Sequence, residues 1–207
     1  MSTLATVTSR IADDINRTDL NTQINLAVNR AIEYYAKRYR FWFNETTATF
    51  NTVADQLNYS SSDTSITDIR EIDYVKIAIS SSNNYELIPV TYKDIQDANV
   101  SDFTGQPSEY SYYKENFYLY EVPDAAYTIT VSYVKSYAAL SAGDSNDFTE
   151  EAEDLIEARA SWWIYQRLLK DKENASMSKQ EEMDALEALV KETNRIKATN
   201  RLVATDF

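Results

Sequence analysis

The stretch Tyr39-Arg40-Phe41-Trp42-Phe43-Asn44-Glu45 marks the point at which the sequence changes from a helical to a strand pattern. On its N-terminal side, apolar residues recur every three or four positions, which predicts a short helix over residues 4–15 and a second helix over residues 20–40. Thr18 or Asp19 is predicted to cap the second helix, because its side-chain oxygen accepts a free backbone N–H. On its C-terminal side the apolar period falls to two, so the chain is predicted to enter a sheet.

Residues 47–146 are predicted to form an antiparallel β region, because short apolar alternations are separated there by turn-forming residues. Ala54-Asp55-Gln56 is interpreted as a hairpin turn between the first two strands, and Lys114-Glu115-Asn116 as a later one. Thr91, with Asp94 three residues on, predicts the start of a short helix. Links this short favour a meander of antiparallel strands.

Residues 147–207 return to a helical pattern. Thr149 precedes a run of acidic residues, which favours the first turn of a helix, where the backbone dipole is positive. Trp162 and Trp163 are adjacent, so this helix is predicted to be covered on two sides. Ser178-Lys179-Gln180-Glu181 has the spacing of a capping box and predicts the start of the last helix.

The predicted fold class is α+β, a helical bundle from the N- and C-terminal helices with an inserted antiparallel β-sheet domain. Residues 1–46 are assigned to the N-terminal helices of the bundle, residues 47–146 to the inserted β region, and residues 147–207 to the C-terminal helices and a tail. Helices from both ends of the chain are therefore expected to pack together.

The composition excludes most classes of enzyme. The chain has no Cys and no His, so it lacks a thiolate nucleophile, a zinc-thiolate site and the commonest general base. Two glycines are too few for a phosphate-binding loop or a dinucleotide-binding motif. We expect no catalysis, no metal and no cofactor. The net charge of −13 argues against an extended nucleic-acid-binding face. No signal peptide or membrane-length apolar run is visible, so a cytoplasmic chain is expected.

Adjacent acidic residues offer a weak alternative. Asp13-Asp14, Glu150-Glu151 and Glu181-Glu182 resemble the paired carboxyl groups of a glycosidase, but neighbours on a helix point in different directions. Two of the three pairs lie where helix starts favour acids, so we interpret the pairs as structural. An acid-base hydrolase using Glu151 with Glu157 is kept as a third hypothesis. The acidic segment 60–68 is interpreted as a solvated loop and not as a Ca²⁺ site, because the EF-hand spacing is absent.

Two groups of residues are candidates for contacts with other proteins. Aromatic and Arg side chains are typical of interface hot spots, but they also fill a junction between helix and sheet. The residues assigned to a subunit interface or to the junction core are Arg40, Phe41, Trp42, Phe43, Trp162 and Trp163. The tail over residues 201–207 is interpreted either as a frayed end or as a segment that docks on a partner.

These features together resemble the head-to-tail adaptor proteins of tailed bacteriophages. The resemblance covers roughly residues 10–170, in the order helix pair, β region and acid-capped helix. It rests on the aromatic stretch at 39–45, Phe50-x-Thr52 with Leu57-x-Tyr59, Gly105-Gln106-Pro107-Ser108-Glu109-Tyr110, and Leu119 through Pro123-Asp124 to Tyr127-Thr128-Ile129-Thr130-Val131-x-Tyr133. No single motif among them is diagnostic.

The resemblance implies a ring, commonly a dodecamer of twelve copies, in the virion neck between capsid and tail. Such a ring binds the portal protein on one side and a tail or second neck protein on the other. Genome DNA passes through its channel without sequence-specific binding, no membrane is involved, and assembly takes place in the host cytoplasm. The C-terminal helix and tail are expected to make the portal contact, through Arg195, Arg201, Leu202, Val203 and Phe207. The alternative from another class is a different phage tail or baseplate structural protein, or a carbohydrate-binding module that uses exposed tyrosines.

Overall fold

The computed structural model describes residues 2–80, 82–98 and 103–198. The chain divides into two compact units, which we call the helical unit and the β unit. The helical unit comprises Met1–Asn44 with Tyr137–Phe207, and the β unit is Glu45–Ser136. Helices and antiparallel sheets are both present, which confirms the predicted α+β class with an inserted sheet.

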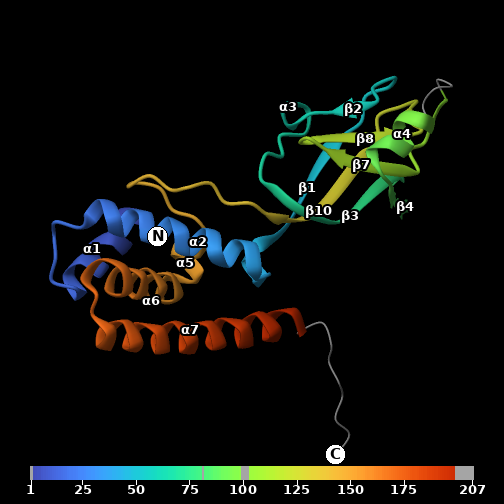
Figure 1. Cartoon of the computed structure of the whole chain (residues 1–207). Coiled ribbons are helices and arrows are strands. Elements are labelled where there is room, and N and C mark those ends of the chain that lie inside the picture. The colour runs from blue at the N-terminus through green and yellow to red at the C-terminus, as the bar shows by residue number, and fades with distance from the viewer. Residues whose placement is uncertain (1, 81, 99–102, 199–207) are drawn as a thin grey trace, which may run out of the picture. The chain divides into compact units, whose positions relative to one another are not determined.

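The helical unit is built around α6, which packs against both α2 and α7 (Figure 1). This confirms that the helix carrying Trp162 and Trp163 is covered on two sides. The elements of this unit are α1 (Leu4–Asp14), α2 (Asn21–Arg38), the 3₁₀ turn η1 (Trp42–Asn44), α5 (Asp147–Glu151), α6 (Glu153–Ile164), the π-helical turn η3 (Tyr165–Leu169) and α7 (Lys172–Ala198). Among the described residues, no helix combines the length and apolar character that crossing a bilayer requires.

The predicted cap of α2 is wrong. The helix begins after Leu20, with no side-chain cap, because the Asp19 carboxylate accepts two hydrogen bonds from the Arg17 guanidinium, at 2.6 and 2.7 Å. A charge-assisted, two-pronged bond of this kind outcompetes the backbone N–H groups of the helix for the same oxygens.

The predicted starts of the C-terminal helices are also wrong. Asn146, and not Thr149, caps α5, since its Oδ1 accepts hydrogen bonds from the backbone N–H groups of residues 148 and 149. The last helix begins six residues before Ser178, which is buried within it. Asp171 takes the capping role there, because its carboxylate accepts the backbone N–H of Asn174 at 3.1 Å.

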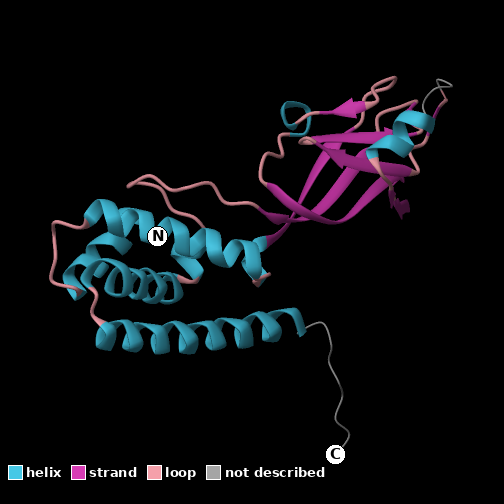
Figure 2. Cartoon of the chain, in the orientation of Figure 1, coloured by secondary structure: helices cyan, strands magenta, loops and turns pink. Residues whose placement is uncertain are grey.

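The β unit contains two four-stranded sheets and a small two-stranded one (Figure 2). The strand orders are β1-β10-β3-β4, β2-β8-β7-β5 and β6-β9. The elements are β1 (Glu45–Asn51), β2 (Asn58–Tyr59), α3 (Ser61–Thr64), β3 (Ile69–Ser80), β4 (Asn83–Glu86), β5 (Ile88–Pro89), α4 (Tyr92–Ala98), β6 (Thr104–Gly105), β7 (Glu109–Tyr113), β8 (Asn116–Tyr120), β9 (Val122–Pro123) and β10 (Thr128–Lys135).

The predicted hairpin at residues 54–56 is wrong. β1 pairs with β10, whereas β2 pairs with β8 in the other four-stranded sheet. The chain changes sheet at this point because the rings of Phe50 and Tyr59 meet in the core, with centroids 5.4 Å apart, and Phe50 also packs on Phe117. Burying these large rings between sheets outweighs the local preference for a hairpin.

The predicted meander of antiparallel strands is only partly correct, because β5 pairs with β7, and β6 with β9, in parallel. Two other local predictions for the β unit are confirmed. Lys114 and Glu115 have φ values of 49° and 62°, which the two central residues of a tight β7–β8 hairpin require. Thr91 and Asp94 form the predicted capping box of α4, with the Asp94 carboxylate accepting the Thr91 N–H at 3.2 Å. The segment 60–68 is not only loop, because α3 forms within it.

Candidate functional site

The aromatic stretch at residues 39–45 is partly core and partly surface. Phe41 and Phe43 are buried, and both pack edge-on against Phe148 of α5, with ring centroids 6.1 and 5.2 Å away. Trp42 is half-buried and Arg40 is exposed. These residues therefore close the core of the helical unit beside the point where the chain leaves for the β unit.

A hydrogen-bonded tie joins the two chain segments that lead to and from the β unit. Asn44 is fully buried, and its amide donates to the Tyr39 carbonyl at 3.3 Å. The Tyr137 hydroxyl contacts the Asn44 side-chain oxygen at 3.3 Å and the Asp147 carboxylate at 2.7 Å. Sequence reasoning missed this tie, because Asn44 and Tyr137 are far apart in the chain.

A buried carboxylate holds α2, α6 and α7 together. Glu182 of α7 is 3% exposed and accepts hydrogen bonds from the Tyr35 hydroxyl at 2.6 Å, the Arg159 guanidinium at 2.5 Å and the Lys179 ammonium at 2.9 Å. Burial alone raises the pKa of Glu182, but these donors outweigh it and hold the pKa below its usual range. Burial, with Glu182 beside it, raises the pKa of Tyr35. Because both of its oxygens already accept hydrogen bonds, Glu182 is a structural group.

Arg159 also contributes to an outer surface of cations and aromatic rings. Its guanidinium lies 3.4 Å from the Tyr34 ring centroid, and Arg38 approaches the same ring to 3.9 Å. Arg30 lies 5.3 Å from the Trp163 ring. We call this the cation–aromatic surface and define it as Arg30, Tyr34, Arg38, Arg159, Trp162 and Trp163.

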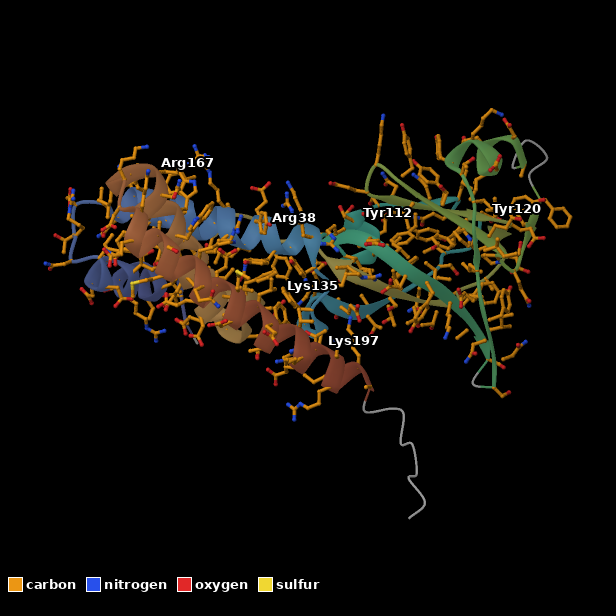
Figure 3. The ribbon with its side chains drawn as sticks, turned by 60° about the horizontal axis from the view of Figure 1, so that its bottom comes forward. Arg38, Tyr112, Tyr120, Lys135, Arg167 and Lys197 are labelled. Atoms are coloured by element: carbon orange, nitrogen blue, oxygen red, sulfur yellow. The ribbon has the colours of Figure 1, made fainter. Side chains whose placement is uncertain are left out.

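The cation–aromatic surface has the composition of a protein-binding hot spot. A hollow of about 220 Å³ lies between α2 and α6 there, and both Trp162 and Trp163 line it half-exposed. Arg38 and Lys197 lie on α2 and near the end of α7 (Figure 3). Tryptophan, tyrosine and arginine dominate the binding energy of protein interfaces. The surface therefore suits another protein better than a small polar molecule.

A second hollow of the helical unit is acidic. It has a volume of about 360 Å³, and it lies where α5 and the first turn of α6 face α7. We call it the acidic groove. Its rim is formed by Glu150, Glu151, Glu153, Asp154 and Glu192, and its apolar floor by Leu155, Ala185, Ala188 and Leu189. Arg10 pairs with Glu153, and Arg195 with Glu192 at 3.2 Å.

The two carboxylates of the hydrolase hypothesis lie in different surroundings. Glu151 is exposed on the rim of the acidic groove, whereas Glu157 is half-buried and does not line it. Burial, and then the charge of Glu153, raise the pKa of Glu157 to about 7, although Arg10 acts in the opposite direction. Within residues 2–80, 82–98 and 103–198, no cluster of side chains suits a metal ion.

The residues expected to bind the portal are only partly within the described chain. Arg195 is exposed on the last turn of α7. Arg201, Leu202, Val203 and Phe207 lie outside the described residues.

Three tyrosines form an aromatic platform on the β unit. Tyr92 of α4 stacks on Tyr113 of β7 with ring centroids 4.7 Å apart, and its edge meets Tyr118 of β8 at the same distance. Tyr113 is 42% exposed. The three residues come from separate elements, so their sequence positions alone did not predict that they meet.

Comparison with known proteins finds one family match over nearly the whole chain. A family model described as SU10 adaptor protein matches residues 2–204. No curated protein matches the chain.

Proposed function

The chain belongs to the SU10 adaptor protein family, and we propose on this premise that it forms a ring beneath the portal of a tailed bacteriophage, linking capsid to tail. Membership bears out the resemblance to phage head-to-tail adaptors and makes the protein a structural component of the virion. Adaptors of this kind associate with portal and tail components. We propose twelve copies, a place in the neck, and assembly in the host cytoplasm.

The extent of the family match carries the proposal. The match runs over residues 2–204 and so includes both the helical unit and the β unit. A match confined to one helix pair would support only a shared packing motif, whereas one of this length supports a shared role for the whole chain.

The role that we propose is non-enzymatic. The chain has no Cys and no His, and the best-placed buried carboxylate, Glu182, already accepts three donors. Glu157, whose pKa of about 7 would suit an acid catalyst, lies outside both hollows just described. These side chains support packing and docking, and we assign no step of chemistry to them.

The charge of the chain supports a path for DNA without specific binding. The net charge is −13, and residues 47–146 hold most of the excess acid. A negatively charged channel wall repels the DNA phosphates and does not bind them, so a duplex can slide through the channel. We propose that the ring lines such a channel; an electrostatic map of the assembled ring with a basic wall would contradict this.

We propose that α7 and the tail bind the portal through Arg195, Arg201, Leu202, Val203 and Phe207. The test is to mix the purified chain with portal rings of its phage and to image the product by electron microscopy. The full chain should add density to the portal, and a chain truncated after Thr199 should not. The truncation leaves α7 (Lys172–Ala198) intact, so an unchanged thermal unfolding midpoint is expected.

A matched variant separates the tail from the helix. Arg195→Ala removes one exposed guanidinium of α7 and leaves the tail complete. Weaker portal binding by both variants supports the proposed contact. Full binding by the truncated chain would contradict it and place the portal contact elsewhere.

The tyrosine platform favours one second candidate, a carbohydrate-binding module. Sugars stack on exposed aromatic rings, and Tyr113, which stacks on the half-buried Tyr92, presents such a ring. A screen against cell-wall glycans tests this candidate, with Tyr113→Ala as the control. Binding by a monomeric chain that is lost in the variant would favour the module over the adaptor.

A further inference from the structure

The helical unit carries two surfaces of opposite charge that do not neutralise each other within one chain. In the part of the chain that the structure describes, Arg30 and Arg38 form no ion pair and contact aromatic rings instead. Glu151 and Asp154 on the rim of the acidic groove likewise form no ion pair with described residues. Each surface therefore keeps charge that a partner can neutralise.

The two surfaces lie toward opposite ends of α6. Asp154 is in its first turn and Trp163 in its last, nine residues on, which corresponds to about 14 Å along a helix axis. Both belong to the same compact unit, so their spacing is fixed by the fold of that unit. A single copy cannot bring one surface onto the other.

We propose that the cation–aromatic surface of one copy docks into the acidic groove of the next copy. This inference rests on the proposed ring. A closed ring uses a head-to-tail interface, which needs two different, mutually complementary patches on every subunit. The helical unit supplies such a pair, with guanidinium groups on one patch and carboxylates on the other.

The two surfaces are complementary in their hydrogen-bonding groups and apolar side chains as well as in their charge. Arg30 and Arg38 present planar guanidinium groups, which bind carboxylates such as Glu151 and Asp154 with two hydrogen bonds each. The half-exposed tryptophan rings at the centre of the cation–aromatic surface need an apolar counterpart, and the floor of the groove offers Ala185, Ala188 and Leu189. Charged rims around an apolar centre are typical of protein interfaces.

Exchanging the charges tests the pairing directly. The first variant is Arg30→Glu with Arg38→Glu, which makes the cation–aromatic surface acidic. The second is Glu151→Lys with Asp154→Lys, which makes the groove basic. Alone, each variant presents like charges across the interface, and its assembly with itself should weaken at least about 10-fold. Mixed in equal amounts, the two variants present opposite charges at every interface and should assemble into rings in which they alternate.

Assembly is measured by native mass spectrometry and electron microscopy, with and without portal rings as a template. Lys93→Glu with Lys114→Glu in the β unit gives the same change in net charge as the first variant and should assemble like the unmodified chain. Neither test variant touches Glu182 or Arg159, and equal thermal unfolding midpoints verify that both variants fold.

Each outcome bears on the inference. Failure of both variants alone, with recovery in the mixture, supports it. Normal assembly of either variant, no recovery in the mixture, or failure of the Lys93→Glu, Lys114→Glu control overturns it. Variants that assemble normally but no longer bind the portal would assign these surfaces to the portal instead. If the unmodified chain neither assembles nor binds the portal, the proposed function fails, and the inference that rests on it fails too.

Discussion

Replacing Glu182 by Ala should lower the free energy of unfolding of the helical unit far more than any surface substitution. The change removes the carboxylate that accepts hydrogen bonds from Tyr35, Arg159 and Lys179. Arg159 is 15% exposed at its side chain, so its charge would stay largely buried without a partner. The side chains of three helices lose their common contact at once.

The magnitude follows from the burial of each partner. Removing one member of a buried ion pair costs about 3–5 kcal/mol, because the remaining charge is uncompensated. The Tyr35 hydroxyl loses one hydrogen bond, which costs about 1–3 kcal/mol when it stays buried. Lys179 is 45% exposed, so its pair adds less than about 1 kcal/mol. These terms overlap, and we expect Glu182→Ala to lower the free energy of unfolding by about 3–5 kcal/mol.

Tryptophan fluorescence during urea unfolding measures the stability of the helical unit specifically. All three tryptophans, at residues 42, 162 and 163, belong to the helical unit, so their emission reports that unit alone. Tyr35→Phe should cost less, about 1.5–3 kcal/mol, since it removes only one of the three hydrogen bonds to the carboxylate. The exposed neighbour Glu181 serves as control, and Glu181→Ala should change the free energy by less than about 0.5 kcal/mol.

The pH dependence follows from the lowered pKa of Glu182. A carboxyl group with a lowered pKa stabilises the fold above its ordinary pKa, and this contribution is lost as the pH falls through the folded value. The difference between the unmodified chain and Glu182→Ala should therefore shrink below about pH 4. A Glu182→Ala protein within 1 kcal/mol of the unmodified chain at pH 7 would refute the proposed role of this carboxylate.

Three further predictions concern other parts of the structure. Burial and the charge of Glu153 raise the pKa of Glu157 to about 7, so the unmodified chain should lose stability as the pH rises from about 4.5 to 7. Glu157→Gln should remove that loss and add about 1–2 kcal/mol at pH 8 in urea unfolding; equal pH profiles would contradict this. Phe41→Ala should cost about 3–5 kcal/mol by the same fluorescence assay, because the ring is buried against Phe148, and a cost below about 1 kcal/mol would mean that the ring is not core. Glu115→Gly should stabilise the β unit by about 1 kcal/mol in thermal unfolding followed by tyrosine circular dichroism, since Glu115 has a φ of 62° that glycine adopts without strain; a loss of stability would contradict it.

Periodicity predicted the existence of most helices, but the sequence did not predict the caps of α2, α5 and α7. Apolar spacing is a property of a whole segment, whereas a cap is decided by competition among a few polar groups. Asp19 has the right side chain to cap α2, yet Arg17 occupies its carboxylate. Ser178 has the spacing of a capping box, yet α7 is already under way there and buries it. Such competition is visible only in three dimensions.

The pairing of strands was the least predictable part of the fold. Alternation marks Phe50 as facing a core, but it carries no information about which strand lies beside β1. The partner is β10, nearly eighty residues away, and the register places Phe50 opposite Ile129. A local hairpin is the natural expectation from a three-residue link, and the aromatic core between the sheets overrides it.

Only two of the six residues of the cation–aromatic surface were singled out from the sequence. Trp162 and Trp163 attract attention as adjacent large rings, but their partners on α2 were missed. Arg30, Tyr34 and Arg38 recur every four residues, which places them on one face of a helix. That spacing was the available signal, and weighing polar and aromatic residues together would have found it.

The tie between Asn44 and Tyr137 bears on how this protein changes during evolution. Asn44 and Tyr137, which flank the inserted segment, are hydrogen-bonded to each other. Residues 45–136 are therefore an insertion whose two ends lie close together at one place on the helical unit. Insertions of different length and sequence can be accommodated at such a site without disturbing the helices around it. A chain in which a short Gly-Ser link joins residues 44 and 137 should keep the tryptophan emission of the intact protein, and relatives should differ in length mainly within this segment.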